Sequence, residues 1–394
     1  MPDPATHCHL IVQDTIMAQQ AVSTFQFVKE CSCLAERCED NCCMVWPVSV
    51  GARTVELWDQ KLPQLLNLIV KDDGGTWMKK TDGDCVAFDN GRCSVHATHG
   101  EDALSDTCRI YPRMYRRING ALTGSASMSC PEIVRLVLKI ATPFAPAQVT
   151  VDDKTLSAYP DKDFPGIDAE QRAAVVQQLN ELVLQDQQTT RHALLRLLDL
   201  TLKLETIACE DWLYALPGLI MDYQTPAGSG ESLAVDPVMV VLIQMLNGPG
   251  VTEAMREQVI RSVDVTPAQG DQPQGMRLKT EFLNLASGRA GQALEPVLKR
   301  FVCAEMSRTG FPFISTTAYG QDYGTSLSQW ACTLALRTLA LRCLLLVHCE
   351  PRMSKPLAIW STASVAAPTT AWRQAQNCFS GRNWVSRVWA ICAC

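Results

Sequence analysis

The sequence predicts a mainly α-helical protein, in which an irregular, cysteine-rich, metal-binding N-terminal domain is followed by an α-helical domain. Two observations predict this class. Ten of the 18 cysteines lie between Cys8 and Cys130, in a stretch with many turn signals. Beyond that stretch, apolar residues recur at helical spacing. We place the cysteine-rich domain at residues 1–150, the helical domain at 151–350, and an atypical basic tail that contains Trp and Cys at 351–394.

Composition excludes several classes of function. The chain has 394 residues, enough for two or three domains with a sizeable core. Its net charge of −6 gives no reason to expect nucleic-acid binding, because such proteins carry basic patches. It lacks an apolar run of about 18 residues, so we expect no membrane-spanning helix. Residues 1–10 lack the basic-then-apolar order of a secretory signal, and we therefore expect a cytoplasmic protein.

Turn signals divide the first domain into short elements. Gly74, Gly83, Gly91 and Gly120 each follow an Asp or Asn, a pairing that suits tight turns. Residues 55–70 have helical apolar spacing and predict one amphipathic helix. Pro63 would either open that helix at its first turn or kink it.

The second domain follows a linker with several prolines at residues 142–166. Asp168 and Gln171 form a capping-box pattern at the start of a helix. A second helix is expected to begin near Thr189 or Thr190. Further helices are expected at residues 210–221, 237–246, 252–263 and 292–308, with a loop at 266–275.

The tail is unusual because Glu350 is the last acidic residue of the chain. One hypothesis is that a shift of the reading frame near Glu350 replaced the original ending, and resequencing the gene tests it. The alternative is a basic aromatic tail that meets a membrane surface or a partner.

The clustered cysteines predict a metal centre rather than a disulfide framework. The first group comprises Cys33, Cys38, Cys42 and Cys43, and its short spacing lets one loop surround a metal. The second group comprises Cys85, Cys93, Cys108 and Cys130, with His96 as a further candidate ligand. Thiolates suit both iron–sulfur clusters and zinc. Cys31 is left open, and Cys209, Cys303, Cys332, Cys343 and Cys349 are expected to be small buried hydrophobes.

The spacing of the cysteines alone does not distinguish a zinc site from an iron–sulfur cluster. Paired C-x2-C knuckles, which are typical of zinc sites, do not occur in this set, and their absence favours a cluster. Arg109 and Arg113 make the stretch after Cys108 locally basic. Their guanidinium groups could stabilise an anionic cluster or hold a carboxylate-bearing ligand such as a cofactor.

These motifs resemble a known family. The residues from Cys33 to Cys43 with Trp46, then Cys93-Ser-Val-His96, Cys108-Arg-Ile-Tyr-Pro-Arg113 and Ser129-Cys130-Pro-Glu132, resemble the bacterial flagellin lysine-N-methylases, whose N-terminal part is similar to zinc- or iron-chelating cysteine-rich domains. The resemblance is dense over residues 25–135 and continues more loosely to Cys349. It implies methyl transfer from S-adenosylmethionine to lysine ε-amines of flagellin and a [4Fe-4S] cluster held by the cysteine motif.

The mechanism stays open between two routes. The chain lacks the glycine-rich turn of doubly wound methyltransferases, and position 45 is Val where the common radical motif C-x3-C-x2-C would place its third Cys. Either a cluster takes part in methyl transfer, or the metal is structural and transfer is a direct displacement. The second route needs a proton acceptor, for which Glu101, Asp102, Asp106 and Tyr111 are candidates.

A rival from another class is a non-enzymatic metal carrier or a redox-sensing interaction protein. The long helical half argues against a bare carrier, because a carrier does not need it. Self-association and peripheral contact with a membrane stay open.

Overall fold

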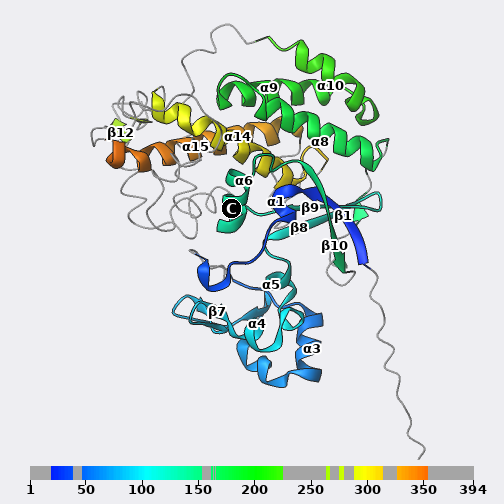
Figure 1. Cartoon of the computed structure of the whole chain (residues 1–394), viewed down its shortest axis with the longest axis vertical. Helices are drawn as coiled ribbons and strands as arrows, with labels where there is room; N and C mark the ends of the chain where they lie inside the picture. The colour runs from blue at the N-terminus through cyan, green and yellow to red at the C-terminus, as the bar shows by residue number, and fades with distance from the viewer. Residues whose placement is uncertain are drawn as a thin grey trace, which may run out of the picture.

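The computed structural model describes residues 19–38, 47–152, 161–162, 164, 166–224, 263–266, 275–278, 288–313 and 326–353 (Figure 1). Cys42, Cys43, the predicted helix at 237–246 and most of that at 252–263 lie outside these residues. Nearly all of the basic tail does too, so both hypotheses about it stay predictions.

Helices build most of the described chain beyond residue 166, as the sequence predicts. They are α8 (Ala169–Leu184), α9 (Thr190–Leu204), η4 (Cys209–Asp211), α10 (Trp212–Met221), α14 (Arg289–Thr309) and α15 (Leu327–Met353). The capping box is confirmed, because Asp168 accepts from the backbone N–H of Gln171 and donates its own N–H to the Gln171 side chain. Thr189 caps α9 in the same way through the N–H of His192.

A five-stranded sheet, which the sequence does not predict, lies against these helices in the order β10-β1-β9-β8-β11. Its strands are β1 (Gln19–Phe25), β8 (Arg113–Ile118), β9 (Ala121–Ala126), β10 (Pro146–Asp152) and β11 (Asp161–Lys162). The tight turn expected at Asn119 and Gly120 is confirmed, with φ of 48° and 75° between β8 and β9. A separate pair, β12 (Val263–Thr266) and β13 (Gly275–Leu278), is antiparallel.

The expectation of a linker at residues 142–166 is wrong for its described parts, because β10 and β11 both belong to the sheet. β10 is an edge strand and begins at Pro146. A proline is tolerated at the start of an edge strand because its missing N–H takes no ladder hydrogen bond there. A strand therefore lies where the prolines of the sequence predict a connector.

One hydrophobic core unites the sheet with the helices across residue 150. It includes Phe27 from α1 (Gln26–Lys29) and Val137 from α6 (Pro131–Lys139), together with Leu179 of α8 and Phe301 of α14. Figure 1 shows α1, α6 and the sheet directly beneath α8 and α14. The start of the chain and its helical half are therefore built around a common interior.

Residues 47–110 form a small lobe below the sheet in Figure 1, with a hydrophobic core of its own. Trp58 is 1% exposed at its centre and donates its indole N–H to the Ala103 carbonyl at 2.9 Å. The elements of the lobe are α3 (Ala52–Lys61), η2 (Pro63–Leu68), β2 (Ile69–Asp72), β3 (Gly75–Met78), β4 (Lys80–Thr81), β5 (Asp84–Cys85), β6 (Phe88–Asp89), β7 (Arg92–Cys93), α4 (Ser94–His99), η3 (Glu101–Ala103) and α5 (Asp106–Ile110).

The single helix expected at residues 55–70 is two helical elements, because Pro63 opens the new 3-10 helix η2 after α3 has ended.

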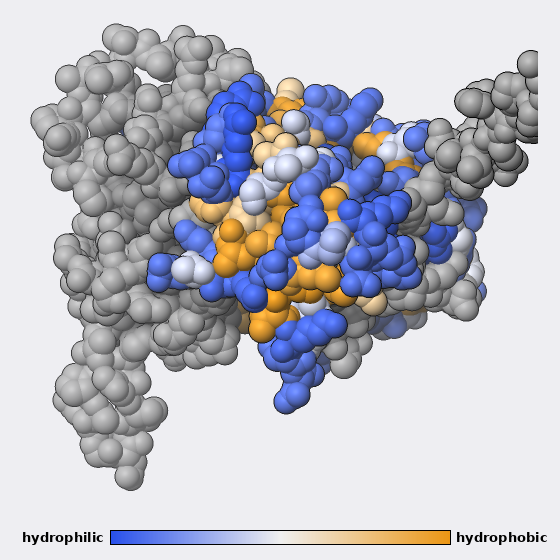
Figure 2. All heavy atoms as spheres, turned by 90° about the horizontal axis from the view of Figure 1, so that it is seen from below, coloured by the Kyte–Doolittle hydropathy of each residue, from blue (hydrophilic) through white to orange (hydrophobic). Residues whose placement is uncertain are grey.

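Figure 2 views the molecule from below, and the described part of this surface mixes apolar residues with hydrophilic ones. Across the part of the chain that the structure describes, none of the helices is long and apolar enough to cross a bilayer.

Candidate metal centre and adjoining cavity

The first cysteine group follows α1, where the chain leaves the main core. Cys31 is buried, Cys33 is exposed and Cys38 is half-buried. The short 3-10 helix η1 (Ala35–Arg37) lies between the last two, and the N–H of Ala35 contacts the Cys33 sulfur at 3.4 Å. The segment therefore presents three thiols over eight residues, from Cys31 to Cys38.

Cys130 joins this group from a distant part of the sequence. It is the N-cap of α6, which packs against α1. Burial raises the pKa of the Cys130 thiol to about 12; hydrogen bonds from the backbone N–H groups of Ile133 and Glu132 oppose the rise, and the negative charges of Cys31 and Cys38 add to it. This influence places all three sulfurs in one electrostatic neighbourhood.

Cys31 experiences similar surroundings. Burial raises the pKa of its thiol to about 11, the Arg113 guanidinium opposes that rise, and the charges of Glu132 and Cys33 add to it. Arg113 also donates to the Cys31 carbonyl at 2.9 Å, which holds β8 against the segment after α1. Arg113, one of the two arginines singled out from the sequence, is thus a cation beside the Cys31 thiol.

Arg109, the other of these arginines, is committed elsewhere. Its side chain is 6% exposed and pairs with Asp106 at 3.0 Å and with Asp152 at 3.7 Å. Asp106 also pairs with Arg53 of α3. This network ties α5 and α3 of the lobe to the edge strand β10, so the described contacts of Arg109 are structural.

Hydroxyl groups position Cys130. Tyr111 and Ser129 share a hydrogen bond of 3.1 Å, and Ser129 and Ser127 share another of 2.7 Å. The N–H of Cys130 donates to the Ser127 carbonyl at 3.3 Å. Tyr111, considered from the sequence as a proton acceptor, therefore lies in the loop that supports a thiol. The sequence reading missed the two serines, for which the run from Ser125 to Cys130 was the only signal.

The remaining cysteines of the second group lie in the lobe. Cys85 is buried on β5, while Cys93 at the end of β7 and Cys108 on α5 pack against the same small core. His96 on α4 is exposed. The structure thus groups Cys130 with the thiols after α1, whereas the sequence reading placed it with Cys85, Cys93 and Cys108.

Within the described ranges, no three Cys, His, Asp or Glu side chains form a group that could hold a single metal ion. Cys42 and Cys43, which belong to the first sequence group, lie outside those ranges. The described thiols therefore influence one another through their charges, and their ligation of a metal stays a prediction.

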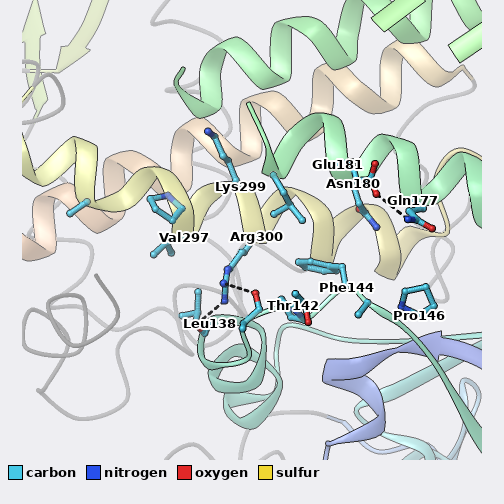
Figure 3. A pocket seen from close by; sticks show the side chains of 16 residues that line it. Leu138, Thr142, Phe144, Pro146, Gln177, Asn180, Glu181, Val297, Lys299 and Arg300 are labelled. Atoms are coloured by element: carbon cyan, nitrogen blue, oxygen red, sulfur yellow. Dashed lines mark hydrogen bonds between the residues drawn. The ribbon is translucent and has the colours of Figure 1, made fainter. Parts of the chain in front are cut away.

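A cavity of about 660 Å³ lies at the opposite end of α6 (Figure 3). Its walls come from the end of α6 and the turn after it, from α8, and from α14. Figure 3 shows Asn180 and Gln177 of α8 facing Phe144 and Pro146 across the space. No local pattern in the sequence indicates this cavity, because three distant segments build it.

Comparisons with known proteins agree with the cysteine motifs. The chain is 26% identical over 156 residues to the lysine-N-methylases of Salmonella typhimurium and Salmonella choleraesuis, and the match covers 36% of this chain and 39% of each relative. It is 28% identical over 134 residues to the flagellar biosynthetic protein FliU of Salmonella muenchen, covering 31% of this chain and 79% of that protein. No family model and no solved structure matches the chain. The family resemblance seen in the sequence is confirmed, over well under half the length of the two methylases.

Proposed function

From this relationship to the flagellin lysine-N-methylases, we propose that the chain methylates the ε-amines of lysine residues on flagellin, with S-adenosylmethionine as the methyl donor. In that transfer the neutral lysine nitrogen forms a bond to the methyl carbon while the bond from that carbon to sulfur breaks. The products are methyl-lysine, S-adenosylhomocysteine and a proton. The observation that carries the proposal is the match to the lysine-N-methylases. The charges of Cys31 and Cys38 act on the Cys130 thiol, and a methylase of an ordinary doubly wound type would not need these thiols.

The thiol group fits an iron–sulfur cluster in its donor chemistry. Burial raises the pKa of both the Cys31 and the Cys130 thiols, and the negative charge of Cys31 repels a charge on Cys130. A metal cluster removes that repulsion, because it binds the thiolates and supplies the missing positive charge. Arg113 would then offset the net negative charge of a cluster held by four thiolates.

The residues proposed to hold the [4Fe-4S] cluster are drawn from Cys31, Cys33, Cys38 and Cys130, together with Cys42 and Cys43 beyond the described ranges. When bound, the cluster would supply redox chemistry or a rigid anchor for the loop after α1. Zinc remains the alternative metal for the same thiols. Cys85, Cys93 and Cys108 are proposed to serve the lobe, either through a separate zinc or as packing residues of its small core.

The test begins with anaerobic purification and analysis of iron, sulfide and zinc. The purified chain is then incubated with flagellin and S-adenosylmethionine that carries an isotopically labelled methyl group. We expect iron and sulfide in the chain and label on flagellin lysines. Stoichiometric zinc without iron would overturn the cluster, and an iron-loaded chain without transfer would favour a metal carrier or redox sensor.

A further inference from the structure

The cavity at the end of α6 has the size and lining of a small-molecule site. Its volume of about 660 Å³ lies within the range usual for pockets that enclose a drug-sized ligand. Phe144, which closes one side, is 8% exposed and packs edge-on against Phe27 with ring centroids 5.5 Å apart. Prolines and aliphatic side chains complete the apolar walls. Buried residues such as Phe144 and Asn180 therefore form the inner walls of the cavity, and exposed residues such as Gln177, Glu181 and Pro146 form its rim.

One wall carries an amide with an unmet hydrogen-bonding group. Asn180 of α8 is 4% exposed, and its Oδ1 is buried without a hydrogen-bond partner. A buried carbonyl without a partner costs free energy, and native structures seldom retain one without a reason. A half-turn of the amide exchanges its oxygen and nitrogen, so Asn180 can offer either a donor or an acceptor to a ligand.

The rim next to Asn180 adds a second amide and a carboxylate. Gln177 donates to the Glu181 carboxylate at 2.9 Å, one turn along the same face of α8. Figure 3 shows both side chains beside Asn180 at the mouth of the cavity. A single carboxamide such as that of Asn180 can pair with the edge of an adenine, which presents a donor and an acceptor side by side.

Two cations border the cavity, and they differ in orientation. Lys299 points away from it and donates to the carbonyls of Asp186 and Gln188, at 2.6 Å and 3.1 Å. Arg300 binds the carbonyls at the end of α6, including that of Leu138 at 2.8 Å. Arg300 therefore keeps one positive charge at the cavity wall, opposite the negative charge of Glu181.

We infer that this cavity binds the methyl donor S-adenosylmethionine, with its adenine at Asn180, its cationic sulfonium toward Glu181 and its carboxylate toward Arg300. The inference rests on the proposed function. A heteroaromatic ring, an apolar sugar face and both signs of charge in one ligand match the amides, the apolar walls and the opposed charges of the lining. A ligand with phosphate groups fits less well, because Lys299 turns its ammonium group away.

The cavity and the thiol group occupy opposite ends of α6. Cys130 caps the first turn of this helix of nine residues, and Leu138 lines the cavity from its last turn. At about 1.5 Å per residue the two sites are on the order of 13 Å apart along the helix axis. Changes in the cavity should therefore leave the metal content unaltered, which gives an independent readout.

The test measures S-adenosylmethionine binding to the anaerobically purified full chain by calorimetry. In the variant Ala293→Trp an indole fills the cavity from α14, and we expect binding to be lost. In Asn180→Leu the amide is replaced by an apolar group of similar size, and we expect affinity to fall about tenfold. Iron content and circular dichroism should match those of the unaltered chain in both variants.

Exposed rim positions keep the test decisive if the buried variants fold poorly. Glu181→Gln should weaken binding, whereas Glu170→Gln, an exposed position on the same helix outside the cavity, should not. An unchanged affinity in Ala293→Trp and Glu181→Gln would overturn the cavity assignment and leave the proposed function standing. If the unaltered chain neither binds S-adenosylmethionine nor transfers a methyl group, both proposals fall.

Discussion

Cys31 lies close enough to Cys130 for its negative charge to raise the pKa of the Cys130 thiol, although one residue follows α1 and the other caps α6. A buried thiol and a half-buried one at the ends of two packed helices are an unusual arrangement for mere packing residues, because the charge of Cys31 disfavours the charged form of Cys130. Ligation of a common metal centre, as we propose, would account for this proximity.

If these thiols are ligands, serine in place of either should reduce the metal content. We expect Cys31→Ser and Cys130→Ser to lower iron affinity by about tenfold or more, since even outer partners of metal ligands contribute that much. Iron analysis and the visible absorption of the anaerobic protein measure the loss. Cys332→Ser is the matched control, because Cys332 is exposed on α15, away from the group. Full iron content in both buried variants would contradict the assignment.

Trp58 should control the stability of the lobe alone. Its ring fills the lobe core and its indole N–H binds the Ala103 carbonyl, so Trp58→Ala should cost about 3–5 kcal/mol locally. Hydrogen exchange should accelerate at residues 47–110 and stay slow in α8 and α9. The converse variant is Trp212→Ala, whose ring belongs to the main core and donates to the Leu204 carbonyl. Equal acceleration everywhere in Trp58→Ala would show that the two cores unfold as one.

Asp186 should make stability depend on pH. Its side chain is 1% exposed, contacts His192 Nδ1 at 2.7 Å and pairs with Arg196 at 3.3 Å. Burial alone would raise the pKa of Asp186, but the hydrogen bonds from His192 and from the N–H of Gln188 outweigh it and lower the pKa. Because the folded-state pKa lies below the unfolded value of about 3.9, the stabilisation is complete above that pH. It is lost as the pH falls through the folded-state pKa.

We therefore expect Asp186→Asn to lower the free energy of unfolding by about 3 kcal/mol at neutral pH. The difference from the unaltered chain should shrink as the pH drops below about 4. Asp199→Asn, which breaks the half-exposed pair with Lys203, should cost less than about 1 kcal/mol. Denaturant titrations across pH measure both, and a pH-independent cost for Asp186→Asn would contradict the argument.

The helices could be predicted from sequence because their signals are local. Asp168 and Gln171 cap α8 within a single turn, and the apolar face of α8 follows the cap directly. Pro63 likewise marked a true boundary, although the sequence left open which kind. α15 was not expected, since its apolar residues are spread around the helix rather than gathered on one face.

The sheet could not be predicted because its strands do not show a recognisable strand pattern in the sequence. β8 contains Arg116 and Arg117, which reads as a basic surface segment rather than a strand. In the fold, Arg116 reaches the carbonyls of Ser307 and Arg308 at the end of α14. This contact joins residues 192 positions apart in the chain, and no local sequence pattern indicates it.

The candidate site was predicted in part. Sequence clustering identified the thiols after α1 and placed Arg113 beside them, which the fold supports through its bond to the Cys31 carbonyl. The sequence leaves the role of Cys31 open and groups Cys130 with the cysteines of the lobe. Proximity between α1 and α6 is a property of tertiary packing, which the spacing of cysteines does not record. The cavity lined by Asn180 escaped notice for the same reason.

Methyl transfer by the anaerobically purified chain to flagellin, followed by peptide mass spectrometry, tests the proposed lysine methylation. With S-adenosylmethionine carrying a labelled methyl group, we expect label on lysine side chains of flagellin, and loss of that label in Cys31→Ser and Cys130→Ser. Unlabelled flagellin after incubation with an iron-loaded chain that binds S-adenosylmethionine would contradict it.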